Sequence, residues 1–282
     1  MSTTGKVRIA AVADLHCRLG RKDNFRRLVR AINEQSADIV LLGGDLTDHG
    51  HPDEAKVLAE SLSELFPPIV AVLGNHDLDC GKRHEVVEIL GSAGITILDG
   101  DRYKKKGGLI GVAGVKGFAG GFGRQALQPF GEEAIKAFVM ETIQESLALE
   151  GALSRTEGAI KIALTHYAPT ASTCVGESPE IMPFLGSSKL GEAIDAQEVA
   201  IAFHGHAHHG TLRGTTPAGR PVFNVALPVL RRIHPDRRAL IVDVPLPPGV
   251  EREELPPVVE STAIEYVSLE EEKEVAARPL LQ

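Results

Sequence analysis

Aspartate, asparagine and histidine recur in short blocks along this chain, and these are the side chains whose types and spacing could do chemistry. The blocks are Asp14-Leu15-His16, Gly44-Asp45, Gly74-Asn75-His76-Asp77, Thr165-His166 and His204-Gly205-His206-Ala207-His208. Carboxylate, amide and imidazole donors without a thiolate suit Mn²⁺, Zn²⁺ or Fe. They are too many for one tetrahedral zinc ion, but fit two ions roughly 3.5–4 Å apart that share a carboxylate. The blocks therefore predict a centre for two divalent metal ions (Mn, Fe or Zn).

Each block comes directly after a short apolar run that is typical of a buried strand. These strands are expected at residues 7–13, 39–42, 69–73, 160–164 and 200–203, and helices are expected at 23–35, 52–65 and 83–93. Alternating strands and helices indicate βαβ units and a parallel sheet, which binds ligands beyond the carboxyl ends of its strands. In an extended segment, residues i and i+2 point to the same side. Asp14 and His16 are therefore expected to face one ion, and so are His206 and His208.

The remaining sequence predicts the frame around this centre. Further strands are expected at residues 109–113, 222–225 and 239–244, and a long helix is expected at 130–149. The glycine-rich stretch 114–123 and the segment 169–189 are expected to shape the pocket. We predict one domain over residues 1–245, followed by a Pro/Glu-rich C-terminal tail at 246–282 that is partly disordered or packed on the surface.

Composition narrows the classes of partner. The chain has 282 residues, 43% of them hydrophobic, and a net charge of −8, which argues against general nucleic-acid binding through a basic surface. It contains 3 cysteines without a CxxC pair, which predicts neither a disulfide framework nor a thiolate zinc site. No signal peptide or membrane span is recognisable, so a cytoplasmic location is expected. The sequence leaves the oligomeric state open.

The ordered motifs DxH, GD, GNHD, a single histidine after a strand, and GHxH resemble the calcineurin-like metallophosphoesterase family, from Asp14 to His208. This resemblance implies an α/β fold, in which a β-sandwich is flanked by helices in four layers (α/β/β/α). It also implies a two-metal site at the edge of the sheets. The expected reaction is hydrolysis of a small phosphate ester, by attack of a metal-bridging hydroxide on phosphorus.

The resemblance also implies a role for each residue. Asp14, His16 and His208 would hold the first ion, Asn75, His166 and His206 would hold the second, and Asp45 would bridge the two. His76 would not be a ligand; it would contact the phosphoryl oxygen or protonate the leaving group. Asp77 would orient His76. The flanking Asp48 is either a turn residue or a support for the centre, and His204 is either a support or a packing residue.

The substrate is less constrained than the centre. The family's protein phosphatases carry an arginine in the second block and GNHE in the third, where this chain has His49 and Asp77. Without an arginine fork, the grip on a phosphomonoester dianion is weaker. We therefore expect a phosphodiester substrate. The alternatives are a phosphomonoesterase or phosphoprotein phosphatase, and a non-catalytic metal-binding scaffold.

Overall fold

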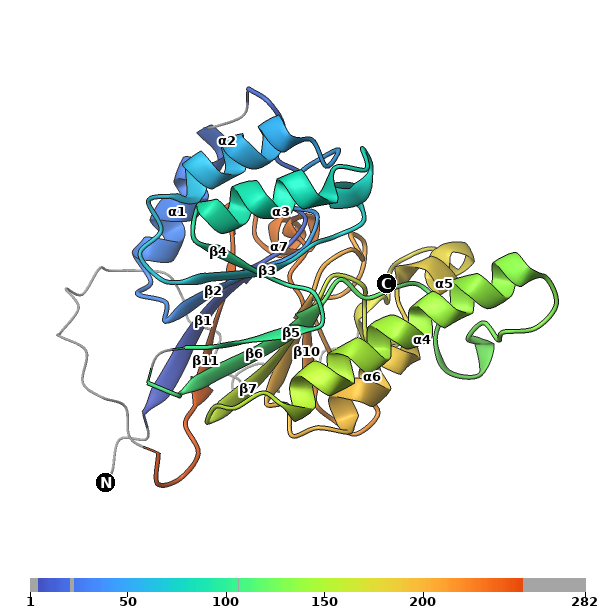
Figure 1. Ribbon diagram of the computed structural model, residues 1–282. Helices are drawn as coiled ribbons and strands as arrows, with labels where there is room; N and C mark the ends of the chain where they lie inside the picture. The colour runs from blue at the N-terminus through green and yellow to red at the C-terminus, as the bar shows by residue number, and fades with distance from the viewer. Residues whose placement is uncertain (1–4, 21–22, 106, 251–282) are drawn as a thin grey trace, which may run out of the picture.

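Two β-sheets pack face to face in the computed structural model, which describes residues 5–20, 23–105 and 107–250 (Figure 1). The first sheet has the order β11-β1-β2-β3-β4, and the second has the order β5-β6-β7-β8-β10-β9. The first sheet comprises β1 (Lys6–Val12), β2 (Ile39–Gly43), β3 (Ile69–Val72), β4 (Ile95–Leu98) and β11 (Leu240–Pro245). The second comprises β5 (Asp101–Lys104), β6 (Ile110–Val115), β7 (Ile160–Thr165), β8 (Ile201–His204), β9 (Arg213–Thr215) and β10 (Pro221–Asn224).

Helices cover the outer face of each sheet. Figure 1 shows α1 (Asp23–Asn33), α2 (Pro52–Leu62) and α3 (Arg83–Ser92) over the first sheet. It shows α4 (Glu133–Ser154) and α6 (Ser188–Asp195) over the second, while α5 (Met182–Leu185) and α7 (Leu227–Ile233) lie in loops after strands. The expected four-layer α/β/β/α sandwich is therefore confirmed.

The direction of the central strands decides where the polar blocks lie. β1, β2, β3 and β4 run parallel to one another, and so do β6, β7, β8 and β10. Antiparallel strands lie at the sheet edges, where β11 pairs with β1, β5 with β6, and β9 with β10. Because parallel strands end at the same edge of a sheet, the loops that follow them gather there.

The strands and helices that the sequence predicts all form, with ends that shift by a few residues. The structure adds β4, β5, β9, α5, α6 and α7, which the sequence did not predict. These elements are short; β5, for example, has the sequence DRYK and is mostly exposed, so it carries little hydrophobic pattern. Of the predicted tail, residues 251–282 lie outside the described part of the chain, and the domain boundary at 245 stays a prediction.

The core between the sheets is built from apolar side chains of both. Phe203 in β8 is fully buried, and its ring stacks on that of Phe223 in β10 with centroids 5.9 Å apart. Phe203 directly precedes the histidine block, so this packing fixes the start of that block. None of the helices among the described residues has the length and apolar character needed to cross a membrane.

We expect Phe203→Ala to lower the free energy of unfolding by about 3–5 kcal/mol, because it removes a buried ring and leaves a cavity. Urea denaturation followed by circular dichroism measures this change. Phe66→Ala is the matched control, because Phe66 is 86% exposed and its replacement should cost less than about 0.5 kcal/mol. Equal losses in both variants would contradict the assignment of Phe203 to the core.

Candidate metal centre

The chain turns sharply after β1 and again after β2. These two turns carry the donors Asp14, His16 and Asp45. Asp14, His16 and Asp45 have φ values of 58°, 43° and 48°, in the left-handed region that Asp and His tolerate better than most residues. The two loops run side by side: the Asp14 N–H donates to the Gly44 carbonyl, and the His16 N–H donates to the Asp45 carbonyl, both at 3.0 Å. The expected extended geometry is therefore wrong here, and left-handed turns aim the side chains instead.

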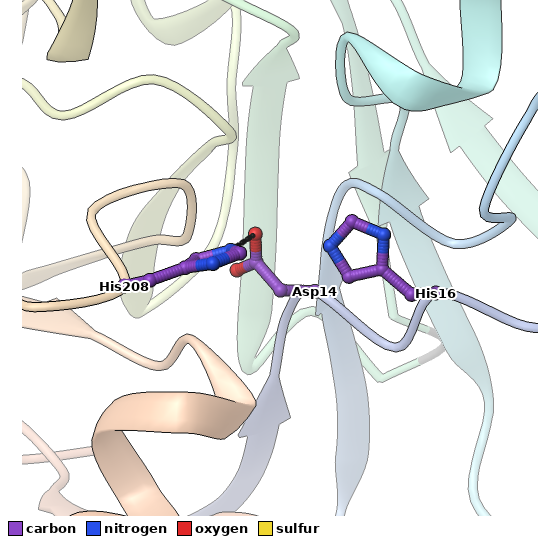
Figure 2. A group of neighbouring side chains, drawn as sticks. All are labelled: Asp14, His16 and His208. Atoms are coloured by element: carbon purple, nitrogen blue, oxygen red, sulfur yellow. Dashed lines mark hydrogen bonds and ion pairs between the residues drawn. The ribbon is translucent and has the colours of Figure 1, made fainter.

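Asp14, His16 and His208 form a first group of donors, with one potential ligand atom from each lying within 4.8 Å of the others. Figure 2 shows the rings of His16 and His208 on opposite sides of the Asp14 carboxylate. His208 Nε2 lies 2.8 Å from Asp14 Oδ1, and this hydrogen bond raises the pKa of His208 above its usual range. The three residues come from two loops that are distant in sequence, as the resemblance implied.

Asp45, His166 and His206 form a second group, which meets the same 4.8 Å criterion. His166 Nδ1 donates to the Gly43 carbonyl at 2.9 Å, so Nε2 is left to face Asn75 Oδ1 at 3.0 Å and Asp45 Oδ1 at 3.4 Å. His206 and His208 therefore belong to different groups, and the expectation that they face one ion is wrong. His206 has a φ of 67°, so the segment is not extended.

Asp45 lies between the two groups. Its Oδ1 faces His166 of the second group, and its Oδ2 lies 3.8 Å from His16 Nε2 of the first. Burial alone would raise the pKa of Asp45, but His166 and the His76 N–H lower that pKa well below its usual range. Asp45 is therefore an ionised carboxylate whose two oxygens point to different sets of imidazoles.

The donor atoms fit divalent cations. Among the buried side-chain nitrogen and oxygen atoms of the described residues, two nitrogens have no hydrogen-bond partner. They are His16 Nε2 and Arg220 Nε. His16 Nδ1 is paired with Asp48 Oδ1 at 3.2 Å, so the imidazole is held with its unpartnered Nε2 directed at the acidic centre. An imidazole fixed in this way, among carboxylates, is a typical metal ligand. The residues present therefore fit a pair of borderline divalent ions.

His76 lies beside His16 of the first donor group. Its ring centroid is 4.7 Å from that of His16, and its N–H donates to Asp45 Oδ1 at 2.9 Å. Its Nδ1 lies 2.9 Å from the Asp48 carbonyl and 3.2 Å from Asp79 Oδ2. Both contacts require a proton on Nδ1, so Nε2 is the ring nitrogen that neither of them uses.

Asp77 does not orient His76, contrary to the expectation from the resemblance. Its buried carboxylate accepts hydrogen bonds from the N–H groups of Leu46, Thr47 and Gly74, at 3.1, 2.8 and 2.8 Å, and from the Thr47 hydroxyl at 2.6 Å. Burial raises the pKa of Asp77, and these hydrogen bonds oppose that rise. Asp77 instead ties the loop after β3 to the loop that carries Asp45.

Comparison with known proteins identifies the family. Residues 7–210 match the sequence profile of the family described as Calcineurin-like phosphoesterase. The chain belongs to this family. Membership implies a hydrolase, and the family's binuclear centre corresponds to the two donor groups described above.

Curated relatives align over shorter stretches. An uncharacterized metallophosphoesterase from Aquifex aeolicus is 32% identical over 115 residues, or 39% of this chain and 42% of that protein. A probable cyclic nucleotide phosphodiesterase from Synechococcus is 32% identical over 78 residues, or 24% of this chain and 31% of that protein. The chain therefore spans less than half the length of these relatives.

Solved structures share the fold at low sequence identity. Phosphopantetheinyl hydrolase from Mycobacterium tuberculosis has a TM-score of 0.60 and 17% identity, and the match covers 89% of this chain and 100% of that one. TT1561 of Thermus thermophilus has a TM-score of 0.50 and 16% identity, and the match covers 80% and 92% of the two chains. These similarities show that this family member has the same layered fold.

Asp48 is a supporting residue whose role the sequence left open. Its carboxylate pairs with His16 Nδ1 and, at 2.7 Å, with Arg18 Nε, while its carbonyl accepts from His76 Nδ1. Asp48 thus fixes both His16 and His76, and the second of these is the task expected of Asp77. Its place in the motif GDLTD was the available signal. His204 is buried and bonds Thr173 Oγ1 at 2.7 Å, beneath the loop rather than in the centre.

Glycines allow the donor side chains to approach neighbouring strands closely. A Cβ on Gly74 would lie 2.0 Å from Asp45 Oδ1, and a Cβ on Gly205 would lie 2.4 Å from Asp14 Oδ2. A Cβ on Gly44 would lie 2.6 Å from His166 Nδ1. Contacts this short are forbidden, so any side chain at these positions would displace a predicted ligand.

We expect Gly74→Ala to lose at least half of the manganese that the wild-type chain retains after dialysis, because the new methyl group displaces Asp45. Elemental analysis of the folded protein measures the bound metal. Gly91→Ala in α3 is the matched control, since a Cβ there meets nothing within 4 Å. Equal metal contents in the two variants would show that the position of Asp45 does not matter for binding.

Proposed function

We propose that this chain hydrolyses phosphodiesters with a pair of divalent metal ions. The observation that carries this proposal is the arrangement of two donor groups around the single carboxylate of Asp45, with His76 next to them. When bound, two such ions neutralise the charge of the phosphate and lower the pKa of a water molecule toward neutrality. The residues of the chain hold, orient and protonate the reacting groups.

The proposed ligands follow the two groups. Asp14, His16 and His208 hold the first ion, and Asn75, His166 and His206 hold the second. Asp45 is shared, because its two oxygens face different groups. The hydrogen bond from His166 Nδ1 to Gly43 and the pairing of His16 Nδ1 with the Asp48 carboxylate support these roles, since each leaves Nε2 as the donor toward the metal.

His76 is the proposed general acid. The Asp48 carbonyl and the Asp79 carboxylate both face its Nδ1, which leaves Nε2 for the substrate. As a general acid, His76 gives a proton from Nε2 to the oxygen of the leaving alcohol as its bond to phosphorus breaks. The His76 N–H also holds the Asp45 carboxylate in place, through the backbone rather than the ring.

Two observations favour a diester over a monoester. His49, where the phosphatases of the family carry an arginine, is largely exposed and pairs with Asp48 and Glu54. Arg18 is also near the centre, but Asp48 binds its guanidinium at 2.7 and 3.1 Å and offsets its charge. A single negative charge therefore suits the site better than a dianion. The similarity to a probable cyclic nucleotide phosphodiesterase supports the same substrate class.

We expect a chelator to abolish hydrolysis of bis(p-nitrophenyl) phosphate and added Mn²⁺ to restore it, because the two ions activate the attacking water. p-Nitrophenolate release measures the rate, with p-nitrophenyl phosphate assayed in parallel as the monoester. Full activity after exhaustive chelation and dialysis would contradict the metal mechanism. A higher kcat/KM for the monoester would support the alternative, a phosphomonoesterase.

We expect His76→Ala to keep both metal ions and to lose about 10²–10⁴-fold in kcat, the usual contribution of a general acid. Elemental analysis and steady-state kinetics are the two measurements. His84→Ala in α3 is a suitable control, since His84 is exposed and belongs to neither donor group. If His76→Ala lost one equivalent of metal, His76 would be a ligand, a role that its distance from His16 and Asp45 permits.

A further inference from the structure

A set of aromatic side chains adjoins the second donor group. The Tyr167 ring packs against that of His206 with centroids 4.4 Å apart, and Phe118 lies 6.0 Å from Tyr167. Phe138 continues the set at 4.8 Å from Phe118, and Phe184 lies 6.4 Å from Phe138. Phe184 also contacts the second donor group, because its carbonyl oxygen lies 3.1 Å from His206 Nε2. We call Phe118, Phe138, Tyr167 and Phe184 the aromatic wall.

Backbone hydrogen bonds assemble the aromatic wall from distant segments. The Gly120 N–H donates to the Pro183 carbonyl and the Gly121 N–H donates to the Gly186 carbonyl, both at 2.8 Å. The Ser188 N–H donates back to the Gly121 carbonyl at 3.1 Å. The glycine-rich stretch and the segment 169–189, both expected to shape the pocket, are thereby joined beside His206. The wall is held in place by the main chain.

The outer end of the aromatic wall is exposed. Phe184 is 57% exposed and Ile181, in the same segment, is 42% exposed, whereas Tyr167 next to His206 is only 8% exposed. Clustered exposed apolar side chains beside a polar site mark ligand-binding surfaces. Because the Phe184 carbonyl lies 3.1 Å from His206 Nε2, the exposed Phe184 side chain belongs to a residue in contact with a proposed ligand of the second ion.

Charged side chains lie on other flanks of the centre. Arg18 pairs with Asp48, which in turn pairs with His16. Asp79 pairs directly with His76. On the side of His208, Arg232 donates to the His208 carbonyl at 3.1 Å. An organic group that extends from a phosphate at the centre toward Phe184 therefore meets apolar surface.

We propose that the aromatic wall binds an apolar organic group of the phosphoester and that Phe184 is its main contact. This inference rests on the proposed function, because it places the phosphate at the donor groups. The substrate class is thereby narrowed to phosphodiesters that carry an apolar or aromatic group. Phe184 selects among substrates, while the metal ligands and His76 act on the phosphorus of any of them.

Phosphonates test the wall without turnover, because their carbon–phosphorus bond is not hydrolysed. We expect phenylphosphonate to inhibit the manganese-loaded enzyme about tenfold more tightly than methylphosphonate, the scale of one good aromatic contact. In Phe184→Ala the ratio of the two inhibition constants should fall below about threefold, and Phe184→Leu should retain part of it. The metal content of each variant is measured, so that the ratios are compared at equal loading.

Phe66→Ala is the control for loss of an exposed phenylalanine. Phe66 is 86% exposed and lies before β3, at the opposite end of that strand from Asn75, so the ratio should stay at the wild-type value. A wild-type ratio near one, or a ratio that survives in Phe184→Ala, would overturn the wall while metal-dependent hydrolysis still supported the proposed function. If neither phosphonate bound and no ester were hydrolysed, the proposed function itself would fail, and the wall with it.

Discussion

The close approach of donor side chains to glycines in the loops after other strands is the constraint on which this centre depends. Asp45 rests against Gly74, Asp14 against Gly205, and His166 against Gly44, each closer than any Cβ would allow. These contacts bring together loops from both sheets, so the donors converge only when the sheets pack with their parallel strands ending at a common edge. The apolar core between the sheets therefore determines the geometry of a site made of polar residues.

Electrostatics distinguishes several of the donors. Burial lowers the pKa of His206 to about 4, with help from the neighbouring His166, so His206 is neutral and ready to coordinate a cation. His208 behaves differently, because its hydrogen bond to Asp14 raises its pKa. In the second group, Asp45 outweighs the effect of burial and raises the pKa of His166 to about 9. A metal ion that binds either group would therefore displace a proton, from His208 in the first and from His166 in the second.

Much of the fold and the identity of the donors could be predicted from the sequence, because both rest on local patterns. Apolar runs mark β1, β2 and β3, and each is followed directly by Asp14, Asp45 or Asn75. The aiming of side chains could not be predicted in this way. The pattern of residues i and i+2 assumes an extended chain, whereas the left-handed backbone at His16 and His206 is visible only in three dimensions. Hydrogen bonds between loops, such as those of Asp77 and Asp48, are equally absent from a linear pattern.

Phe184 contributes to both the substrate surface and the metal centre. Its ring is exposed to solvent, and its carbonyl oxygen accepts a hydrogen bond from His206. A side-chain replacement at this position leaves the acceptor in place, whereas an insertion or deletion in the segment moves it. Divergence of substrate preference within such a protein would therefore proceed by point substitution at a constant loop length. Changes in loop length would alter catalysis and preference together.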